Sequence, residues 1–233
     1  MNAPVAEPAT ANSGSKAARP TSPRKPVQKR SRERYERLLD ATESLLSAQD
    51  AGSVGLYDIA KHANVPPASV YHFFPTKEAA FVALAERFLT QLNTATHILP
   101  LDHRKIERWS DIFVMVTDRL ITFYNEHPVL LKLFFGSGLT PDIRRRDMDY
   151  INRLSESGYD WMNRYFVMPY IPDPEMKFAI IYAIYDGITC ASYERHGRVT
   201  EEFRDGLIAA VLAYCRTFLP DVIPLRPPEI GQA

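Results

Sequence analysis

Apolar residues recur at helical spacing through most of the chain, and prolines or glycines stand at the breaks between these runs. Apolar residues three and four positions apart lie on one face of a helix. No segment shows the period-two alternation, flanked by hairpin turns, that is typical of a half-buried strand. We therefore predict an all-α fold of about nine helices. The expected helices span residues 32–48, 56–63, 66–74, 77–97, 104–126, 128–137, 141–166, 174–196 and 200–219.

The two ends of the chain differ from this helical body. Residues 1–30 contain five prolines and almost no large apolar side chains, and four further prolines interrupt residues 220–233. Such segments cannot offset the entropy lost on ordering, so we expect a disordered arm over 1–30 and a disordered tail over 220–233. Residues 1–34 hold eight basic and two acidic side chains, whereas residues 35–233 hold 20 basic and 26 acidic ones. A basic arm on a mildly acidic body favours contact with a polyanion, although a solubilising tail is the alternative.

Several classes of protein find no support in the sequence. Cys190 and Cys215 lie in apolar helical patterns, which indicates buried free thiols in a reducing compartment. No run of about 18 apolar residues predicts a membrane span, and no apolar signal core begins the chain, so we expect a cytoplasmic protein. GxSxG, HExxH and phosphate-loop motifs are absent, so we expect neither an enzyme nor a metal or other cofactor. His97 and His103 flank a proline turn and are expected to be solvated.

Residues 56–77 predict two short helices joined by a tight turn. Asn64, which tolerates positive φ, stands in the turn, while Pro67 presets the first turn of the second helix and Pro75 ends it. So short a helix buries little, and its polar and aromatic residues are typical of the recognition helix of a helix-turn-helix, here at 54–73. The residues expected to form its small core are Ile59, Ala60, Val65, Val70 and Phe74.

We expect this second helix and the basic arm to contact DNA. Its polar residues can bond base edges or phosphates, and its small apolar residues can meet a thymine methyl group. Tyr71 is expected on a phosphate, with packing in an aromatic core stripe as the alternative, and Lys77 is expected to be a phosphate clamp. The cations of the arm can follow the backbone or enter a minor groove. The candidate DNA-binding residues are Lys25, Lys29, Arg30, Arg32, Pro67, Ala68, Ser69, Tyr71, His72 and Lys77.

The run IAKHANVPPASVYHFFPTKE at 59–78 resembles the signature of the tetracycline-repressor (TetR) family, and LLDATESLL at 38–46 fits that family's first helix. The resemblance covers residues 31–91. It implies a three-helix DNA-binding domain over 31–91, a helical ligand-binding and dimerisation domain over 92–219, and operator DNA as the partner of a homodimer. Two positions depart from the family pattern. Gly55 stands where Thr is common, and Pro66 with Pro67 replaces the commoner Ser-x pair, which removes a polar group from the reading surface.

The last two helices are apolar over wide faces, which indicates burial on two sides. Small residues at near-helical spacing would admit a partner helix, so we predict a four-helix dimer interface; a monomeric helical hairpin is the alternative. The expected interface residues are Ala183, Gly187, Cys190, Ala191, Leu207, Val211 and Tyr214. Aromatic and methionine residues of the middle helices suggest an apolar pocket. The candidate pocket residues, each of which could instead pack in the core, are Trp109, Phe113, Phe134, Met162, Tyr165, Phe166, Tyr182 and Tyr185.

These patterns predict a ligand-responsive, DNA-binding transcriptional regulator. Within the family resemblance, we expect a repressor that a small, largely apolar or aromatic effector releases from its operator. One alternative is a helical adaptor that never touches DNA, and salt-sensitive DNA binding separates the two. Another alternative is an activator of the same family, because repression or activation depends on where the operator lies.

Overall fold

The computed structural model describes residues 22–26, 28–98 and 102–226, and over these ranges the chain is all-α, as predicted. Nine α-helices lie in this part of the chain. They are α1 (Lys29–Ala48), α2 (Leu56–His62), α3 (Pro67–Phe73), α4 (Lys77–Asn93), α5 (Trp109–Glu126), α6 (Pro128–Phe135), α7 (Pro141–Met162), α8 (Pro174–His196) and α9 (Glu201–Cys215). None of these helices is long and apolar enough to cross a membrane.

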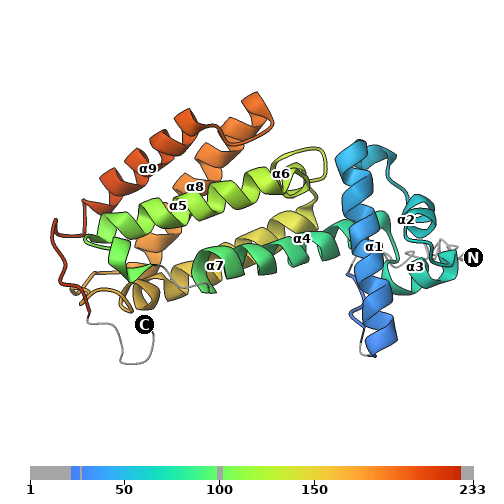
Figure 1. Cartoon of the computed structure of the whole chain (residues 1–233), viewed down its shortest axis with the longest axis horizontal. Coiled ribbons are helices and arrows are strands. Elements are labelled where there is room, and N and C mark those ends of the chain that lie inside the picture. The colour runs from blue at the N-terminus through green and yellow to red at the C-terminus, as the bar shows by residue number, and fades with distance from the viewer. Residues whose placement is uncertain (1–21, 27, 99–101, 227–233) are drawn as a thin grey trace, which may run out of the picture.

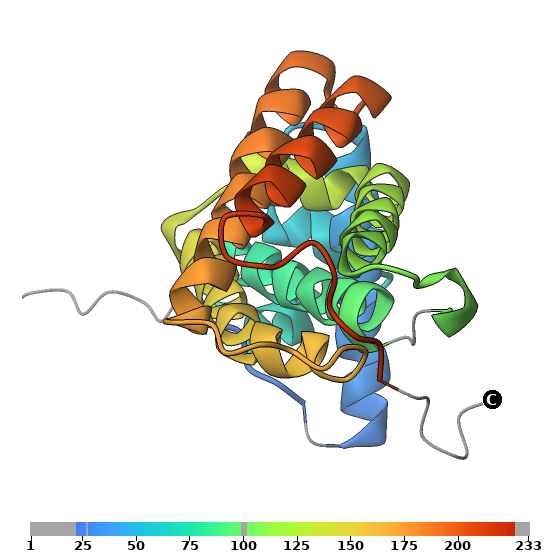
Figure 2. The same ribbon diagram turned by 90° about the vertical axis from the view of Figure 1, so that its left-hand side faces the viewer.

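Helices α1, α2 and α3 form a small unit at one end of an elongated molecule (Figure 1). Helix α4 leaves this unit and runs into the body built by α5 to α9, where α8 packs against both α7 and α9. The end-on view shows α8 and α9 side by side along one margin of the body (Figure 2). Apolar residues of α6, among them Leu130 and Leu133, share one core with α1 to α4, while α5, α8 and α9 surround a second core. Helix α4 contacts both α1 and α7, and α6 contacts both α1 and α8, so these two helices connect the two parts.

The local sequence determines the helix-turn-helix. The Gly55 amide donates to the Asp58 carboxylate at 3.1 Å and so satisfies one of the free amides at the start of α2. Asn64 adopts a positive φ of 51°, as expected for the turn, and Pro67 opens α3. Phe74 adopts an extended conformation before Pro75 and is fully buried. All five predicted core residues of this motif are buried.

Four predicted helix ends, at residues 97, 104, 166 and 219, lie four or five residues from those of the structure, at Asn93, Trp109, Met162 and Cys215. Side-chain hydrogen bonds account for the first two. The helix expected from residue 104 begins at Trp109, because the Asp111 carboxylate accepts from the amides of Glu107 at 2.9 Å and Arg108 at 2.8 Å. The helix expected to reach residue 97 keeps α-helical bonding to Asn93 and continues as a π-helical turn over Thr94–Ile98. The Thr96 hydroxyl there donates to Leu92 O at 2.8 Å and competes with the helical amides for carbonyls.

The prediction of disordered ends is wrong for part of each end, because the structure shows ordered residues within both predicted segments. Lys29 already belongs to α1. Residues Pro220–Arg226 pack on the body: the Val167 amide donates to Pro224 O at 2.8 Å, and the Arg226 amide donates to Tyr165 O at 2.7 Å. These backbone bonds, together with Ile223 buried in the second core, fix this part of the tail on the body. Residues 1–21, 27 and 227–233 of the expected arm and tail lie outside the described residues.

Candidate DNA-binding surface and ligand cavity

The exposed face of α3 carries most of the candidate recognition residues. Pro67, Ala68 and His72 are exposed and Ser69 is half-buried. The Tyr71 ring is 56% exposed, so it does not belong to the aromatic core stripe, which holds Phe73 and Phe74 instead. Helix α3 therefore presents small, hydroxyl and imidazole side chains on a firmly anchored backbone, as base-edge or phosphate contacts require.

The Lys77 ammonium, expected to be free to bind a DNA phosphate, is already hydrogen-bonded within the protein. Its ammonium donates to the carbonyl oxygens of Gly52 at 2.9 Å and Ala51 at 3.3 Å, in the short turn between α1 and α2. An ammonium has three protons, so one remains for another acceptor. The Lys77 side chain thus connects the start of α4 to the turn between α1 and α2, and this structural role does not depend on DNA.

The candidate cations before and within α1 fall into two groups. Lys25, whose side chain is 75% exposed, pairs with Glu86 of α4 at 3.0 Å. The neighbouring Arg24 amide donates to Phe73 O at 3.0 Å, so this segment lies along the helix-turn-helix instead of extending freely. Lys29 and Arg30, in the first turn of α1, and Arg32 after them have exposed side chains.

One exposed aromatic residue on this side of the molecule was not predicted. Tyr57, in the first turn of α2, is 65% exposed, and α2 packs closely on α3. An exposed tyrosine offers a hydroxyl to phosphate oxygens in the same way as Tyr71 does. The sequence signal was available, because Tyr57 follows Leu56 and precedes Ile59, which face the core, and so falls on the opposite face of the helix.

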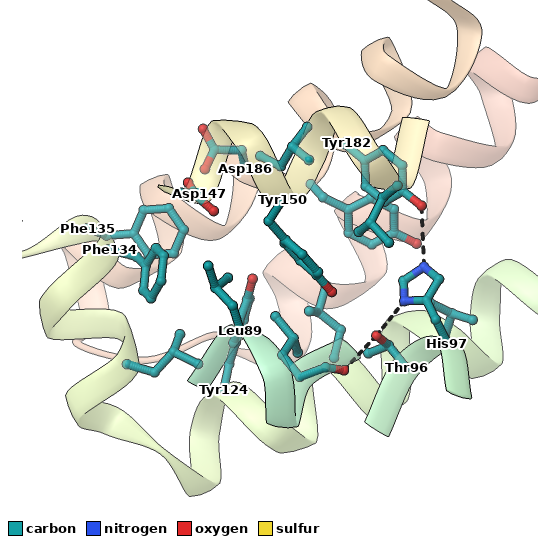
Figure 3. A pocket seen from close by; sticks show the side chains of 17 residues that line it. Leu89, Thr96, His97, Tyr124, Phe134, Phe135, Asp147, Tyr150, Tyr182 and Asp186 are labelled. Atoms are coloured by element: carbon teal, nitrogen blue, oxygen red, sulfur yellow. Dashed lines mark hydrogen bonds between the residues drawn. The ribbon is translucent and has the colours of Figure 1, made fainter. Parts of the chain in front are cut away.

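A cavity of about 70 Å³ lies between α4, α5, α6, α7 and α8 (Figure 3). Three of the eight predicted pocket residues, Phe134, Tyr182 and Tyr185, line it. The other five pack in the second core: Trp109, Phe113, Met162, Tyr165 and Phe166. They are absent from the cavity wall because they pack against residues of α8, α9 and the segment that follows α9. The Trp109 indole, for example, donates to Pro220 O at 2.9 Å.

Most cavity-lining residues were not predicted. Leu89, Leu92, Leu130 and Leu154 supply much of the apolar wall, and six polar residues that were not predicted interrupt it. These polar residues are Thr96, His97, Tyr124, Asp147, Tyr150 and Asp186. Their sequence signal is weak, since each is a single polar side chain within an amphipathic helix or at its end, where a solvated position is the ordinary interpretation.

A hydrogen-bond chain occupies one end of the cavity. Thr96 Oγ1 lies 2.6 Å from Nδ1 of His97, and Nε2 of His97 lies 3.3 Å from the Tyr182 hydroxyl. The single Thr96 proton goes to Leu92 O, which leaves Nδ1 as the protonated nitrogen and Nε2 as an acceptor. Burial lowers the pKa of His97 to about 4, so the imidazole is neutral at pH 7. The prediction of a solvated His97 is therefore wrong, and the side chain of His103 lies outside the described residues.

A carboxylate pair occupies the other end of the cavity, beside Phe135, and the Tyr150 ring lies between the two ends (Figure 3). Arg144 bridges the pair, donating to Asp147 Oδ2 at 3.0 Å and to Asp186 Oδ2 at 2.9 Å. Burial, and then the charge of Asp186, raises the pKa of Asp147 to about 6.

The tyrosines of the wall differ in whether their hydroxyls are already bonded. Tyr185 shares a 2.6 Å hydrogen bond with Thr117, and Tyr182 contacts His97, so the hydroxyls of the two predicted pocket tyrosines that line the cavity are already bonded. The Tyr124 hydroxyl points into the cavity (Figure 3), and none of the hydrogen bonds recorded among the described residues uses it. Burial raises the pKa values of Tyr124 and Tyr150, so both phenols are neutral donors.

The predicted dimer surface is only partly available. Leu207 and Val211 are fully buried between α9 and the rest of the body, so these two assignments are wrong. The apolar face of α9 turns toward α5 and α8, which an apolar pattern alone could not distinguish from a partner. Ala183 and Gly187 are exposed on α8. Cys190, Ala191 and Tyr214 are half-buried, and both cysteines are free thiols.

Comparison with known proteins agrees with this arrangement. Residues 38–84 match the family model for bacterial regulatory proteins of the tetR family. The chain is 24% identical over 131 residues to the uncharacterized HTH-type transcriptional regulator YvdT of Bacillus subtilis (strain 168), covering 56% of this chain and 64% of that protein's length. A TetR-family transcriptional regulator from Streptomyces coelicolor superposes with a TM-score of 0.61 at 20% identity, over 80% of this chain and 99% of that one.

A second solved structure carries a functional description. NalD, the secondary repressor of the MexAB-OprM multidrug efflux pump in Pseudomonas aeruginosa, superposes with a TM-score of 0.53 at 18% identity, over 82% of this chain and 100% of that one. At these identities the likeness to the solved structures concerns the fold. The N-terminal match contains the helix-turn-helix, so this chain carries a DNA-binding segment of the tetR-family type on the fold of TetR-family transcriptional regulators.

Proposed function

We propose that the protein is a homodimeric, cytoplasmic repressor that leaves its operator when a small effector fills the cavity. Residues 31–91 would form the DNA-binding domain and residues 92–219 the ligand-binding and dimerisation domain. The cavity is the main support for this proposal. Its wall includes residues of α4 and α6, and both helices also pack against α1. The repressor role of NalD, which shares this fold, supports repression over activation.

Operator binding would use the exposed face of α3, together with Tyr57 of α2 and the cations of α1. One recognition helix as short as Pro67–Phe73 makes few contacts, so tight binding requires two copies. Two half-sites about 34 Å apart would then face one dimer. The exposed stripe of Ala183 and Gly187 on α8 supports a partner helix there, because no atom lies within 4 Å of a Cβ built on Gly187.

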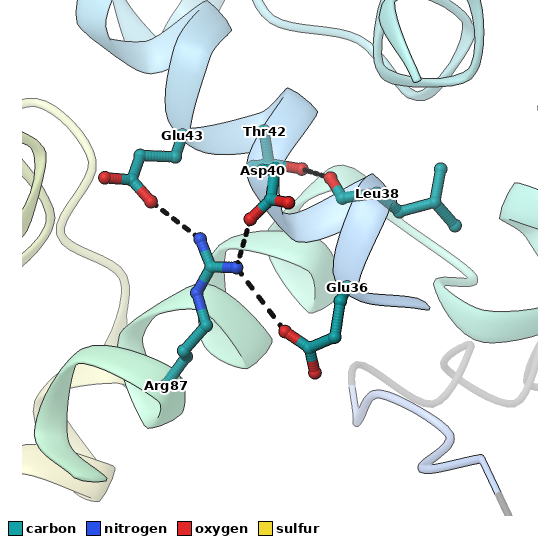
Figure 4. A network of polar contacts seen from close by, with 6 residues as sticks. All are labelled: Glu36, Leu38, Asp40, Thr42, Glu43 and Arg87. Atoms are coloured by element: carbon teal, nitrogen blue, oxygen red, sulfur yellow. Dashed lines mark hydrogen bonds and ion pairs between the residues drawn. The ribbon is translucent and has the colours of Figure 1, made fainter. Parts of the chain in front are cut away.

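Helix α4 connects the cavity to the DNA-binding domain directly. Leu89 and Leu92 line the cavity, and Arg87, two residues before Leu89, is the centre of an ion-pair cluster with α1 (Figure 4). The Arg87 guanidinium donates to Asp40 at 2.6 Å and to Glu43 at 2.6 Å, and it lies 3.5 Å from Glu36. A displacement of α4 would therefore be transmitted to α1.

Helix α6 makes a second connection. Phe134 and Phe135 line the cavity, and Lys132 of the same helix donates to Leu46 O, in the last turn of α1, at 2.6 Å. At about 70 Å³ the cavity is smaller than the roughly 150 Å³ that accommodates benzene. A ligand of that size or larger would have to displace side chains of the wall or at least one of the helices that carry them. Such a ligand would favour a different body conformation and would shift the spacing of the two recognition helices.

The test begins with selection of binding sites from a random double-stranded DNA library by the full-length protein. Fluorescence anisotropy with the selected site should then show tight binding that weakens steeply with salt. Compounds that raise the melting temperature should release this DNA, and in a reconstituted transcription assay the free protein should block the promoter. Failure to select any DNA would support the adaptor alternative, and stimulation of transcription by the DNA-bound protein would support activation.

A further inference from the structure

The cavity has an unusual charge balance for an apolar ligand site. Asp147 of α7 and Asp186 of α8 both line it, and one guanidinium, that of Arg144, neutralises the pair. Two carboxylates with a single cation leave one negative charge at this end of the wall. Buried carboxylates are normally matched by cations, because an unmatched buried charge is costly.

The sharing of Arg144 is unequal. Nη1 and Nη2 of Arg144 both reach Asp186, at 3.3 Å and 2.9 Å, whereas Asp147 receives one contact, from Nη1. The Asp147 side chain is 11% exposed and that of Arg144 is 42% exposed, so the guanidinium lies on the solvent side of the pair. No other described residue donates a hydrogen bond to Asp147, so this carboxylate retains acceptor capacity. Its raised pKa agrees with incomplete compensation.

The remainder of the wall offers no positive charge to an anion. The other polar groups that face the cavity are Thr96, His97, Tyr124, Tyr150, Tyr182 and Tyr185. Burial holds the imidazole and the phenols in their neutral forms. Tyr124 directs into the space a hydroxyl that makes no hydrogen bond to another described residue (Figure 3), and the aromatic faces of the wall attract cations.

We propose that the effector is a cationic amphiphile, with an ammonium or similar group on Asp147 and Asp186 and an apolar, aromatic-compatible body among Leu89, Phe134 and Tyr150. This inference rests on the proposed function and specifies its ligand class. The positive group would supply the cation that the acid pair lacks, and the Tyr124 hydroxyl would remain for an acceptor on the ligand.

Three matched probes of one skeleton test this proposal: phenylbutylamine, phenylbutanol and phenylbutanoate, which are cationic, neutral and anionic at pH 7. Isothermal titration with the full-length protein should show that the amine binds about tenfold or more tightly than the alcohol, and that the carboxylate binds more weakly still. Asp147→Asn should abolish most of the preference for the amine. Asp160→Asn, on the exposed side of the same helix, is the matched control and should keep it.

The double variant Asp147→Asn with Asp186→Asn gives a result that misfolding cannot imitate. It leaves Arg144 as the unmatched charge of the cavity, so the preference should invert and the carboxylate probe should bind more tightly than the amine. Equal binding of the three probes to the natural protein, tighter binding of the carboxylate, or no binding of the amine would overturn the proposal. An amine that binds with the expected preference but leaves DNA binding unchanged would contradict the proposed function and leave the ligand class standing.

Discussion

The Lys132 ammonium donates to Leu46 O at 2.6 Å and to Gln49 O at 3.3 Å, so a cation of α6 caps the C-terminal end of α1. The carbonyls at this end of a helix have no partners within the helix, and the helix dipole favours a positive charge there. Helix α6 also lines the cavity. The hydrogen bonds from the Lys132 ammonium to the carbonyls of Leu46 and Gln49 therefore connect the cavity wall to the end of α1.

We predict that Lys132→Met lowers the unfolding free energy by about 1–2 kcal/mol, since the carbonyls lose a charged donor while the aliphatic stem is kept. An effector should bind the variant normally but release DNA less completely. Urea denaturation and anisotropy titrations measure the two effects. Lys105→Met, an exposed lysine far from α1, is the control. Unchanged stability together with unchanged release would show that α6 does not transmit the signal.

Tyr71 and Lys77 should respond differently to substitution, although both are DNA-binding candidates. Tyr71→Ala should weaken DNA binding by about tenfold per half-site and leave the melting temperature unchanged, because the ring is 56% exposed. Lys77→Ala should lower both DNA affinity and stability, because its ammonium bonds the carbonyls of Ala51 and Gly52. Tyr170→Ala, whose side chain is 88% exposed on the body, should change neither quantity. A Tyr71→Ala protein with full affinity would contradict the phosphate contact.

Gly187 permits a test of the dimer that does not disturb the protomer. Its Cα faces open space, with no atom within 4 Å of an added Cβ. Gly187→Arg should therefore keep the helical circular dichroism spectrum and give a monomer by light scattering, with DNA affinity reduced to that of one half-site. Asn152→Arg, exposed on α7, should remain a dimer. A dimeric Gly187→Arg protein would place the interface elsewhere.

The sequence predicted the helices better than the cavity, for a physical reason. Proline, glycine and apolar periodicity act locally, so the short helices around Asn64 and Pro67 follow from a few residues. An apolar side chain such as Phe166 or Leu207 is consistent with a core, a cavity wall or an interface, and only the packing of other helices decides among them. Likewise, His97 lies next to a predicted turn in sequence, and only the approach of Trp161 and Tyr182 places it in the cavity wall.

Two titrating groups of the cavity should oppose each other between pH 4 and 6. His97 has a lowered pKa of about 4 against 6.5, so in this range the unfolded chain holds more protons at this site and stability rises with pH. Asp147 has a raised pKa of about 6 against 3.8, so the folded chain holds more protons and stability falls with pH. Each effect is at most about 3 kcal/mol, and together they nearly cancel in the natural protein.

Single substitutions should reveal each effect. The unfolding free energy of the natural protein minus that of His97→Gln should rise from pH 4 to 6.5. The variant lacks the imidazole, which is harder to protonate in the folded protein than in the unfolded chain. The corresponding difference for Asp147→Asn should fall between pH 4 and 6. The variant lacks the carboxyl that binds a proton more tightly in the folded protein than in the unfolded chain. Urea denaturation at half-unit pH steps measures both curves. The double variant, as internal control, should give their sum if the two groups titrate independently. A flat curve for His97→Gln would mean that the imidazole is already solvated in the folded protein, and would remove the hydrogen-bond chain from the cavity wall.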